Sequence, residues 1–177
     1  MTKVRVATAW LDGCSGCHMS LLDIDERLFL LAQRIEIIFG PFVDYKVFPD
    51  AVDVTLVEGA VSNEQDEDHI CTIRERSHIL ISFGDCAVTA NVPAMRNQFN
   101  PENVLHRAYE ENASSNGGIP GLEIPHLLRK ARPVHEFVPV DLFLPGCPPP
   151  PDTIHYVLTE LLEGRMPDLI GKTRFGA

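Results

Sequence analysis

Apolar, β-branched segments alternate with amphipathic ones along this chain, and the alternation restricts its fold more than any other feature. It predicts strands at residues 4–10, 35–39, 52–57, 78–83 and 138–144. It predicts helices at residues 20–34, 63–77 and 102–112, a polar loop at 113–125, and a last helix that Asp152 caps and that runs through Glu163. Because alternating strands and helices form right-handed crossovers, we predict an α/β sandwich of three layers, a parallel sheet with helices on both faces.

Length and composition agree with a globular chain of this kind. The 177 residues fit a single domain, residues 1–177, and 45% of them are hydrophobic and 23% charged. A formal charge of −10 disfavours nucleic acid and anionic membrane surfaces as partners. The sequence has no long apolar run and no signal-peptide pattern at its start, so we expect no membrane span and a cytoplasmic location.

Four of the five cysteines follow directly after predicted strands. They are Cys14, Cys17, Cys86 and Cys147. The carboxyl ends of parallel strands meet at one edge of a sheet, where ligands collect, so these thiols are expected to converge. Glu58 follows another strand at the same edge. The fifth cysteine, Cys71, lies within a predicted helix and is expected to be a small buried side chain.

Four converging thiols can bind either zinc or an iron-sulfur cluster. Structural zinc sites usually combine two short Cys-x-x-Cys units, whereas this chain has one such unit and two widely separated cysteines. That spacing favours a single 4Fe-4S cluster, which is larger and can be reached from different loops. Two alternatives stay open: a zinc-stabilised structural subunit, and a thiol-disulfide redox protein that uses Cys14 and Cys17 alone.

Residues beside the cysteines are candidates for a supporting role. Four glycines let the backbone approach closely and point amide groups at cluster sulfides: Gly13, Gly16, Gly84 and Gly146. Pro148 opens a run of four prolines that stiffens the last cysteine loop. His18 is interpreted either as a contact of the cluster or partner or as an ordinary polar residue. Glu58 is interpreted as a subunit anchor, part of a proton path, or a loop cap.

Four segments around these residues resemble the small subunits of nickel-iron hydrogenases. They are DGCSGCHMS from Asp12, VEGAVSNEQDE from Val57, GDCAVTANVPAMRN from Gly84 and LPGCPPPPDTI from Leu144. The continuation LLDIDERL resembles the cytoplasmic NAD-reducing branch of that family. The cluster-bearing subunit of the quinone reductase of complex I is also similar, but its first two ligand cysteines are adjacent. Here Ser15 and Gly16 separate them, which favours the hydrogenase branch.

The resemblance implies a flavodoxin-like fold that carries a proximal 4Fe-4S cluster on Cys14, Cys17, Cys86 and Cys147. It also implies a large subunit that holds the nickel-iron centre and iron-sulfur and flavin diaphorase subunits, with FMN, that reduce NAD. This chain would relay electrons and make no bonds itself, so no catalytic residue is expected in it. Longer members of the family hold further clusters, but no cysteine follows Cys147, so one cluster is expected.

Overall fold

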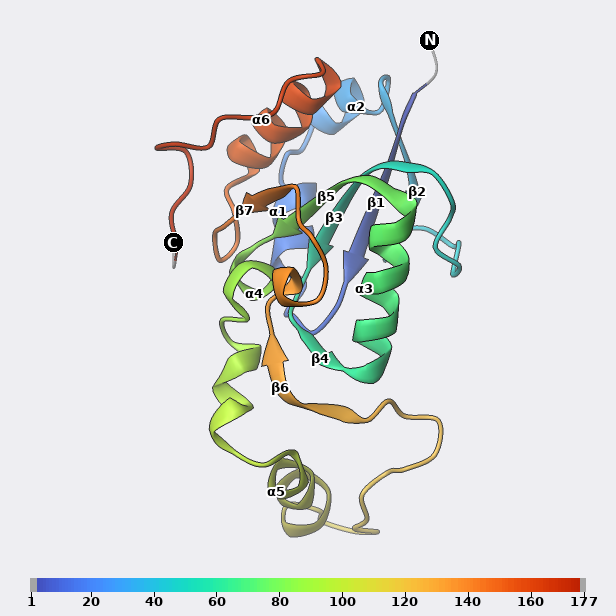
Figure 1. Cartoon of the computed structure of the whole chain (residues 1–177), viewed down its shortest axis with the longest axis vertical. Coiled ribbons are helices and arrows are strands. Elements are labelled where there is room, and N and C mark those ends of the chain that lie inside the picture. The colour runs from blue at the N-terminus through green and yellow to red at the C-terminus, as the bar shows by residue number, and fades with distance from the viewer. Residues whose placement is uncertain (1–2, 176–177) are drawn as a thin grey trace.

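A five-stranded parallel sheet forms the centre of the computed structural model, which describes residues 3–175 (Figure 1). Its strands are β1 (Val4–Trp10), β2 (Ile35–Phe39), β3 (Val52–Glu58), β5 (Ser77–Phe83) and β7 (Leu142–Leu144). They lie in the order β2-β1-β3-β5-β7, and every neighbouring pair is parallel. This is the flavodoxin-like order, in which the chain first adds strands on one side of β1 and then on the other. The predicted fold class is therefore confirmed.

Helices cover both faces of this sheet, and side chains alternate between them along each strand. Leu56 and Ile81 point into a core shared with α1 (Gly16–Leu22), α2 (Arg27–Leu31) and α6 (Pro151–Leu162). Their neighbours Val57 and Leu80 point into a second core with α3 (Glu64–Arg76) and α4 (Asp85–Thr89). This two-residue period is the reason that the strand predictions succeeded. Between residues 3 and 175, no helix is long and apolar enough to cross a membrane.

The predicted helix at residues 20–34 is wrong as a single element. The chain forms α1 and α2 with a turn between them, in which Asp25 adopts a left-handed conformation with φ of +61°. Leu21, Ile24 and Leu31 are nonetheless all buried in the same core. Their helical spacing predicted the buried face correctly, but it carries no information about a turn that keeps the same side inward.

The last predicted strand and helix also differ in their boundaries. The strand covers three residues, Leu142–Leu144, instead of seven, since Pro139 has no N–H to donate to a neighbouring strand. Helix α6 begins at Pro151 after Pro150, so Asp152 lies in its first turn and is not the cap. The Asp152 carboxylate instead pairs with Arg27 at 2.8 Å and links α6 to α2.

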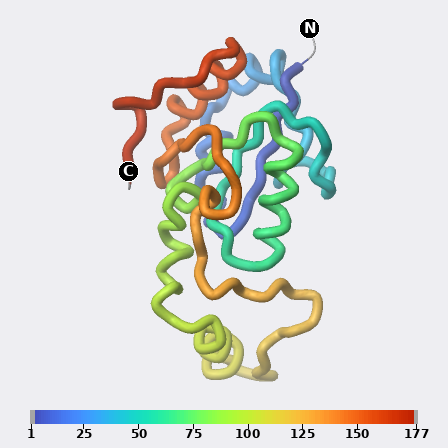
Figure 2. The backbone as a smooth tube through the Cα atoms, viewed as in Figure 1, coloured from blue at the N-terminus to red at the C-terminus, as the bar shows by residue number. Residues whose placement is uncertain are grey.

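A small second sheet was not predicted. Strand β4 (Val61–Asn63) pairs antiparallel with β6 (Leu127–Arg132). Residues 91–126 form an arm, which includes a 3₁₀ helix, η1 (Pro93–Gln98), and then α5 (Pro101–His106). Helix α5 continues as a π-helical turn, η2 (Arg107–Glu111), so that the helix predicted at 102–112 is present with a change of type in its second half. Figure 2 shows this arm extending away from the main body. No residue from 91 to 126 is buried.

Burial predicts unequal effects for the same substitution at two leucines, one in the core and one at the surface. Leu56→Ala should lower the free energy of unfolding by about 2–5 kcal/mol, because Leu56 is 0% exposed at the centre of the sheet and its truncation leaves a cavity. Leu30→Ala is the matched control, since Leu30 is 63% exposed on α2. Urea unfolding measures both. Equal losses in the two variants would contradict this description of the core.

Asp141 predicts an acid-sensitive contribution to stability. Partial burial works to raise the pKa of Asp141, but hydrogen bonds from Arg74 (2.6 Å) and the Leu80 N–H (2.7 Å), with the Arg74 charge, outweigh it and lower the pKa below 3.8. A lowered folded-state pKa means that this stabilisation is present above pH ~4 and lost as the pH falls through the lowered value.

Asp141→Asn should therefore flatten the acid limb of the melting temperature against pH. Its loss of stability at neutral pH should stay below about 1 kcal/mol, because the Asp141 side chain is 40% exposed and solvent screens the pair. Asp44→Asn, at an exposed position, is the control and should leave the acid limb unchanged. If the acid limb of Asp141→Asn were the same as that of the wild type, Asp141 would not be the source of this acid-sensitive stability.

Candidate metal centre

Three parallel strands deliver the four predicted cysteines to one edge of the sheet. Cys14 and Cys17 follow β1, Cys86 follows β5, and Cys147 follows β7. The thiols are close enough for the charges of Cys14, Cys86 and Cys147 all to act on Cys17. All four are free thiols. The predicted convergence of these residues is thus what the structure shows, while their role as ligands stays a prediction.

The protein surroundings disfavour thiolates at this edge. Burial, then the charge of Glu58, then the other three thiols raise the pKa of Cys17 well above its ordinary value. Burial likewise raises the pKa of Cys86 to about 11, although a hydrogen bond from the Val92 N–H acts in the opposite direction. Converging thiols become thiolates when a metal supplies the compensating positive charge. This set of soft sulfur donors therefore fits an iron-sulfur cluster chemically.

A single metal ion has no ready-made set of ligands in this structure. Across residues 3–175, no three His, Cys, Asp or Glu side chains are grouped as they would be around one ion. Cys71, the fifth cysteine, lies apart on α3 and is exposed, so the prediction that it is buried is wrong. The buried face of α3 carries Ile70 and Ile73, three residues apart, and Cys71 lies outside that spacing.

Two glycines beside the thiols are required by close contacts. Gly84 has φ of +85°, and a Cβ at this position would overlap the Sγ of Cys17. Gly146 has φ of +141°, and its Cβ would lie 2.6 Å from the Cα of Pro149. A side chain at either position would push a cysteine loop away from the edge. Gly16 is also near a thiol, since its Cβ would lie 3.2 Å from the Sγ of Cys14.

Asp85 is a structural residue of the site that the sequence analysis did not single out. Its carboxylate accepts a hydrogen bond from the Gly146 N–H at 2.7 Å, and its own N–H donates to the Gly146 carbonyl at 2.9 Å. These two bonds join the loop of Cys86 to the loop of Cys147. Asp85 is 4% exposed. In the sequence, its position between Gly84, which ends a strand, and Cys86 could have marked it as a residue of the site.

His18 and Glu58 form a buried pair immediately beside Cys17. Each is 1% exposed. One carboxylate oxygen of Glu58 accepts from the His18 N–H at 2.9 Å and lies 2.5 Å from the ring Nδ1. The ring Nε2 of His18 has no hydrogen-bond partner among the described residues. Gly13 lies against this pair, since a Cβ there would be 3.5 Å from the other carboxylate oxygen of Glu58.

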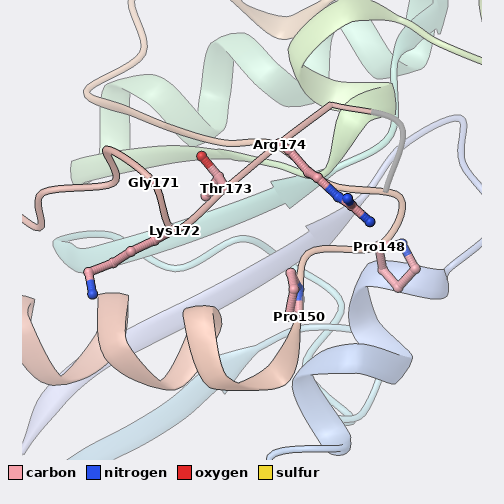
Figure 3. A pocket seen from close by; sticks show the side chains of 6 residues that line it. All are labelled: Pro148, Pro150, Gly171, Lys172, Thr173 and Arg174. Carbon is pink, nitrogen blue, oxygen red and sulfur yellow. The ribbon is translucent and has the colours of Figure 1, made fainter.

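The proline loop after Cys147 is fastened to α1. The Ser20 hydroxyl donates to the Pro149 carbonyl at 2.5 Å. Pro148 and Pro150 line a cavity of about 330 Å³ together with the C-terminal segment from Gly171 to Arg174 (Figure 3). No cysteine lines this cavity, so it is separate from the thiol site. Pro148 thus lies between the two, at the start of a fixed loop.

Comparison with known proteins relates the whole chain to components of hydrogenases. A family model described as NADH ubiquinone oxidoreductase, 20 Kd subunit, matches residues 14–161. The chain is 41% identical over 168 residues to a component of the F420-non-reducing hydrogenase vhu of Methanocaldococcus jannaschii, covering 94% of this chain and 58% of that protein. It is 41% identical over 172 residues to the delta component of the NAD-reducing hydrogenase HoxS of Cupriavidus necator, covering 94% and 82%. It therefore spans little more than half of the first of these relatives.

Solved structures show the same relationship. A chain of the NAD+-reducing NiFe hydrogenase in the H2-reduced state superimposes with a TM-score of 0.94 and 39% identity. The match covers 98% of this chain and 99% of that one. A NiFeSe hydrogenase of Dm. baculatum matches with a TM-score of 0.61 at 19% identity, a likeness of fold alone.

The contact between Gly84 and Cys17 predicts a site-specific effect of one added methyl group. Gly84→Ala should lose most of the iron that the chain binds, because the new Cβ displaces the Cys17 thiol. Gly171→Ala is the control, since Gly171 also has a positive φ, +71°, but its Cβ would meet nothing within 4 Å. Both variants carry backbone strain, which is on the order of 1–3 kcal/mol at Gly84, where ψ is 162°. Iron per chain after anaerobic purification measures the difference, and equal iron in both variants would disprove the contact argument.

Proposed function

Because the chain belongs to the family described as NADH ubiquinone oxidoreductase, 20 Kd subunit, which here includes hydrogenase subunits, we propose that it is the electron-transferring small subunit of a NAD-reducing nickel-iron hydrogenase. The overall reaction would be the reduction of NAD+ by H2. The observation that carries this proposal is the convergence of four thiols at the edge of a fold that matches 99% of a chain of such an enzyme.

Cys14, Cys17, Cys86 and Cys147 would hold one 4Fe-4S cluster, which supplies reversible uptake of a single electron when bound. The chain's own residues would hold that group, with Cys14 and Cys147 exposed in this chain. Cys17 is buried and the loops that carry the other three thiols are joined by hydrogen bonds. We assign no bond-making residue to this chain, since its proposed part is to relay electrons.

The partners would be a large subunit with the nickel-iron centre and a diaphorase with iron-sulfur clusters, FMN and the NAD site. The hydrogen chemistry would take place in the large subunit. Residues 1–177 acting as one domain with one cluster, and a cytoplasmic location, remain predictions from the sequence.

A second candidate is a hydrogenase subunit that serves an acceptor other than NAD. The observation in its favour is the 41% identity to a component of an F420-non-reducing hydrogenase, equal to the identity with the NAD-reducing relative. The structural match favours the first candidate, because a chain of the NAD+-reducing NiFe hydrogenase superimposes with a TM-score of 0.94 at 39% identity. Assaying the purified complex with H2 and NAD+ separates the two.

Removing a proposed ligand should separate electron delivery from hydrogen chemistry. Cys86→Ser and Cys147→Ser should each abolish the reduction of NAD+ by H2 in the purified complex, because the relay is broken. Hydrogen-deuterium exchange at the large subunit should continue. Cys71→Ser is the matched control, since this thiol is exposed on α3 away from the edge, and it should leave both activities unchanged.

Metal analysis of the unaltered protein tests the same assignment independently. Anaerobically purified protein should contain about four irons per chain. Zinc with little iron would favour the zinc-stabilised alternative, and an absence of metal would favour a dithiol. Survival of NAD+ reduction in either Cys→Ser variant would show that the four-ligand assignment is wrong.

A further inference from the structure

A buried acid–imidazole pair lies where the central strand meets the first cysteine loop. Glu58 is the last residue of β3, which lies between β1 and β5, the two strands that deliver Cys14, Cys17 and Cys86. Glu58 is 1% exposed. Burying an acidic side chain is unfavourable unless hydrogen bonds compensate it. Electron relay as proposed above makes no use of this group.

Hydrogen bonds tie the Glu58 carboxylate to the residue after Cys17. The same oxygen accepts from the backbone N–H of His18 at 2.9 Å and contacts its ring Nδ1 at 2.5 Å. The ring is held edge-on by Phe42 and Phe83, with centroids 5.8 and 6.4 Å away. Because both donors belong to one residue at the start of α1, the carboxylate fixes the turn that presents Cys17.

The charge of Glu58 also reaches the thiols. One carboxylate oxygen accepts from the N–H of His18, which follows Cys17, and the other would lie 3.5 Å from a Cβ on Gly13, which precedes Cys14. Charges interact more strongly in a buried setting than in water, since the effective dielectric constant is lower. An electron added beside a fixed negative charge is less stable. A carboxylate at this position therefore favours the oxidised form of a nearby redox group.

We propose that Glu58 is a positioning residue that fixes the Cys17 turn through His18 and, by its negative charge, lowers the reduction potential of the cluster held there. This inference rests on the proposed function, because it requires a cluster at the four thiols. It assigns two separable effects to one side chain: the hydrogen bonds hold the turn, and the charge sets the potential.

Glu58→Gln separates the two effects. The amide oxygen can still accept both hydrogen bonds from His18, while the charge is removed. In the purified complex, iron per chain should stay at the wild-type value. A redox titration followed by electron paramagnetic resonance should show the reduced cluster favoured at least about tenfold, a positive shift of about 59 mV for one electron.

Glu36→Gln is the matched control, because it removes the same charge from an exposed position on β2. Solvent and salt screen that charge, so its shift should be much smaller. A Glu58→Gln complex with full iron and the wild-type potential would overturn the inference, as would an equal shift in Glu36→Gln.

Glu58→Asp keeps the test decisive if the Gln variant binds no cluster. The shorter side chain retains the charge and strains the bonds to His18, so iron loading should fall while the remaining cluster keeps the wild-type potential. Full loading, or a positive shift as large as that expected for Gln, would overturn the inference. Wild-type protein without iron would overturn the proposed function, which distinguishes that failure from a failure confined to the Glu58 variants.

Discussion

Burial of thiols beside one another and beside a carboxylate is the constraint around which this edge of the molecule is built. Burial raises the pKa of Cys17 most, and the charges of Glu58 and then of the other three thiols raise it further. The protein alone therefore favours neutral thiols. A metal group that binds sulfur reverses this preference, because its positive charge is shared by all the donors at once. The fold accordingly holds the four thiols together independently of any bond among them.

Hydrogen bonds between distant segments provide that support. Asp85 bonds to Gly146 across 61 residues, Ser20 bonds to Pro149 across 129, and Glu58 bonds to His18 across 40. Each bond joins a side chain to a backbone group in another part of the site. The loops around the thiols are thus fixed by polar contacts to one another, whereas the sheet beneath them is fixed by apolar packing.

Elements in which apolar residues recur at a regular spacing could be predicted from the sequence. Features that depend on contacts between distant segments could not. Strands such as β3 and β5 are β-branched with a two-residue period, and their ends placed the cysteines correctly. The turn between α1 and α2 interrupts no apolar spacing and so left no signal. Strand β6 reads LLRKAR, and with three charged residues among six it could not be recognised without its partner β4. The sequence placed Glu58 at the right edge, but only the structure pairs it with His18.

Substitutions in the core and at the thiol edge are expected to affect different properties of the protein first. Leu56 is fully buried under the sheet's helices. Gly84 and Gly146 contribute no apolar area, yet their positive φ angles and close contacts allow two loops to approach. A substitution at either glycine therefore acts first on the metal site, and one in the core acts first on stability. Phe83 joins the two regions, because it packs in the same core as Cys17 and its ring contacts the His18 ring edge-on.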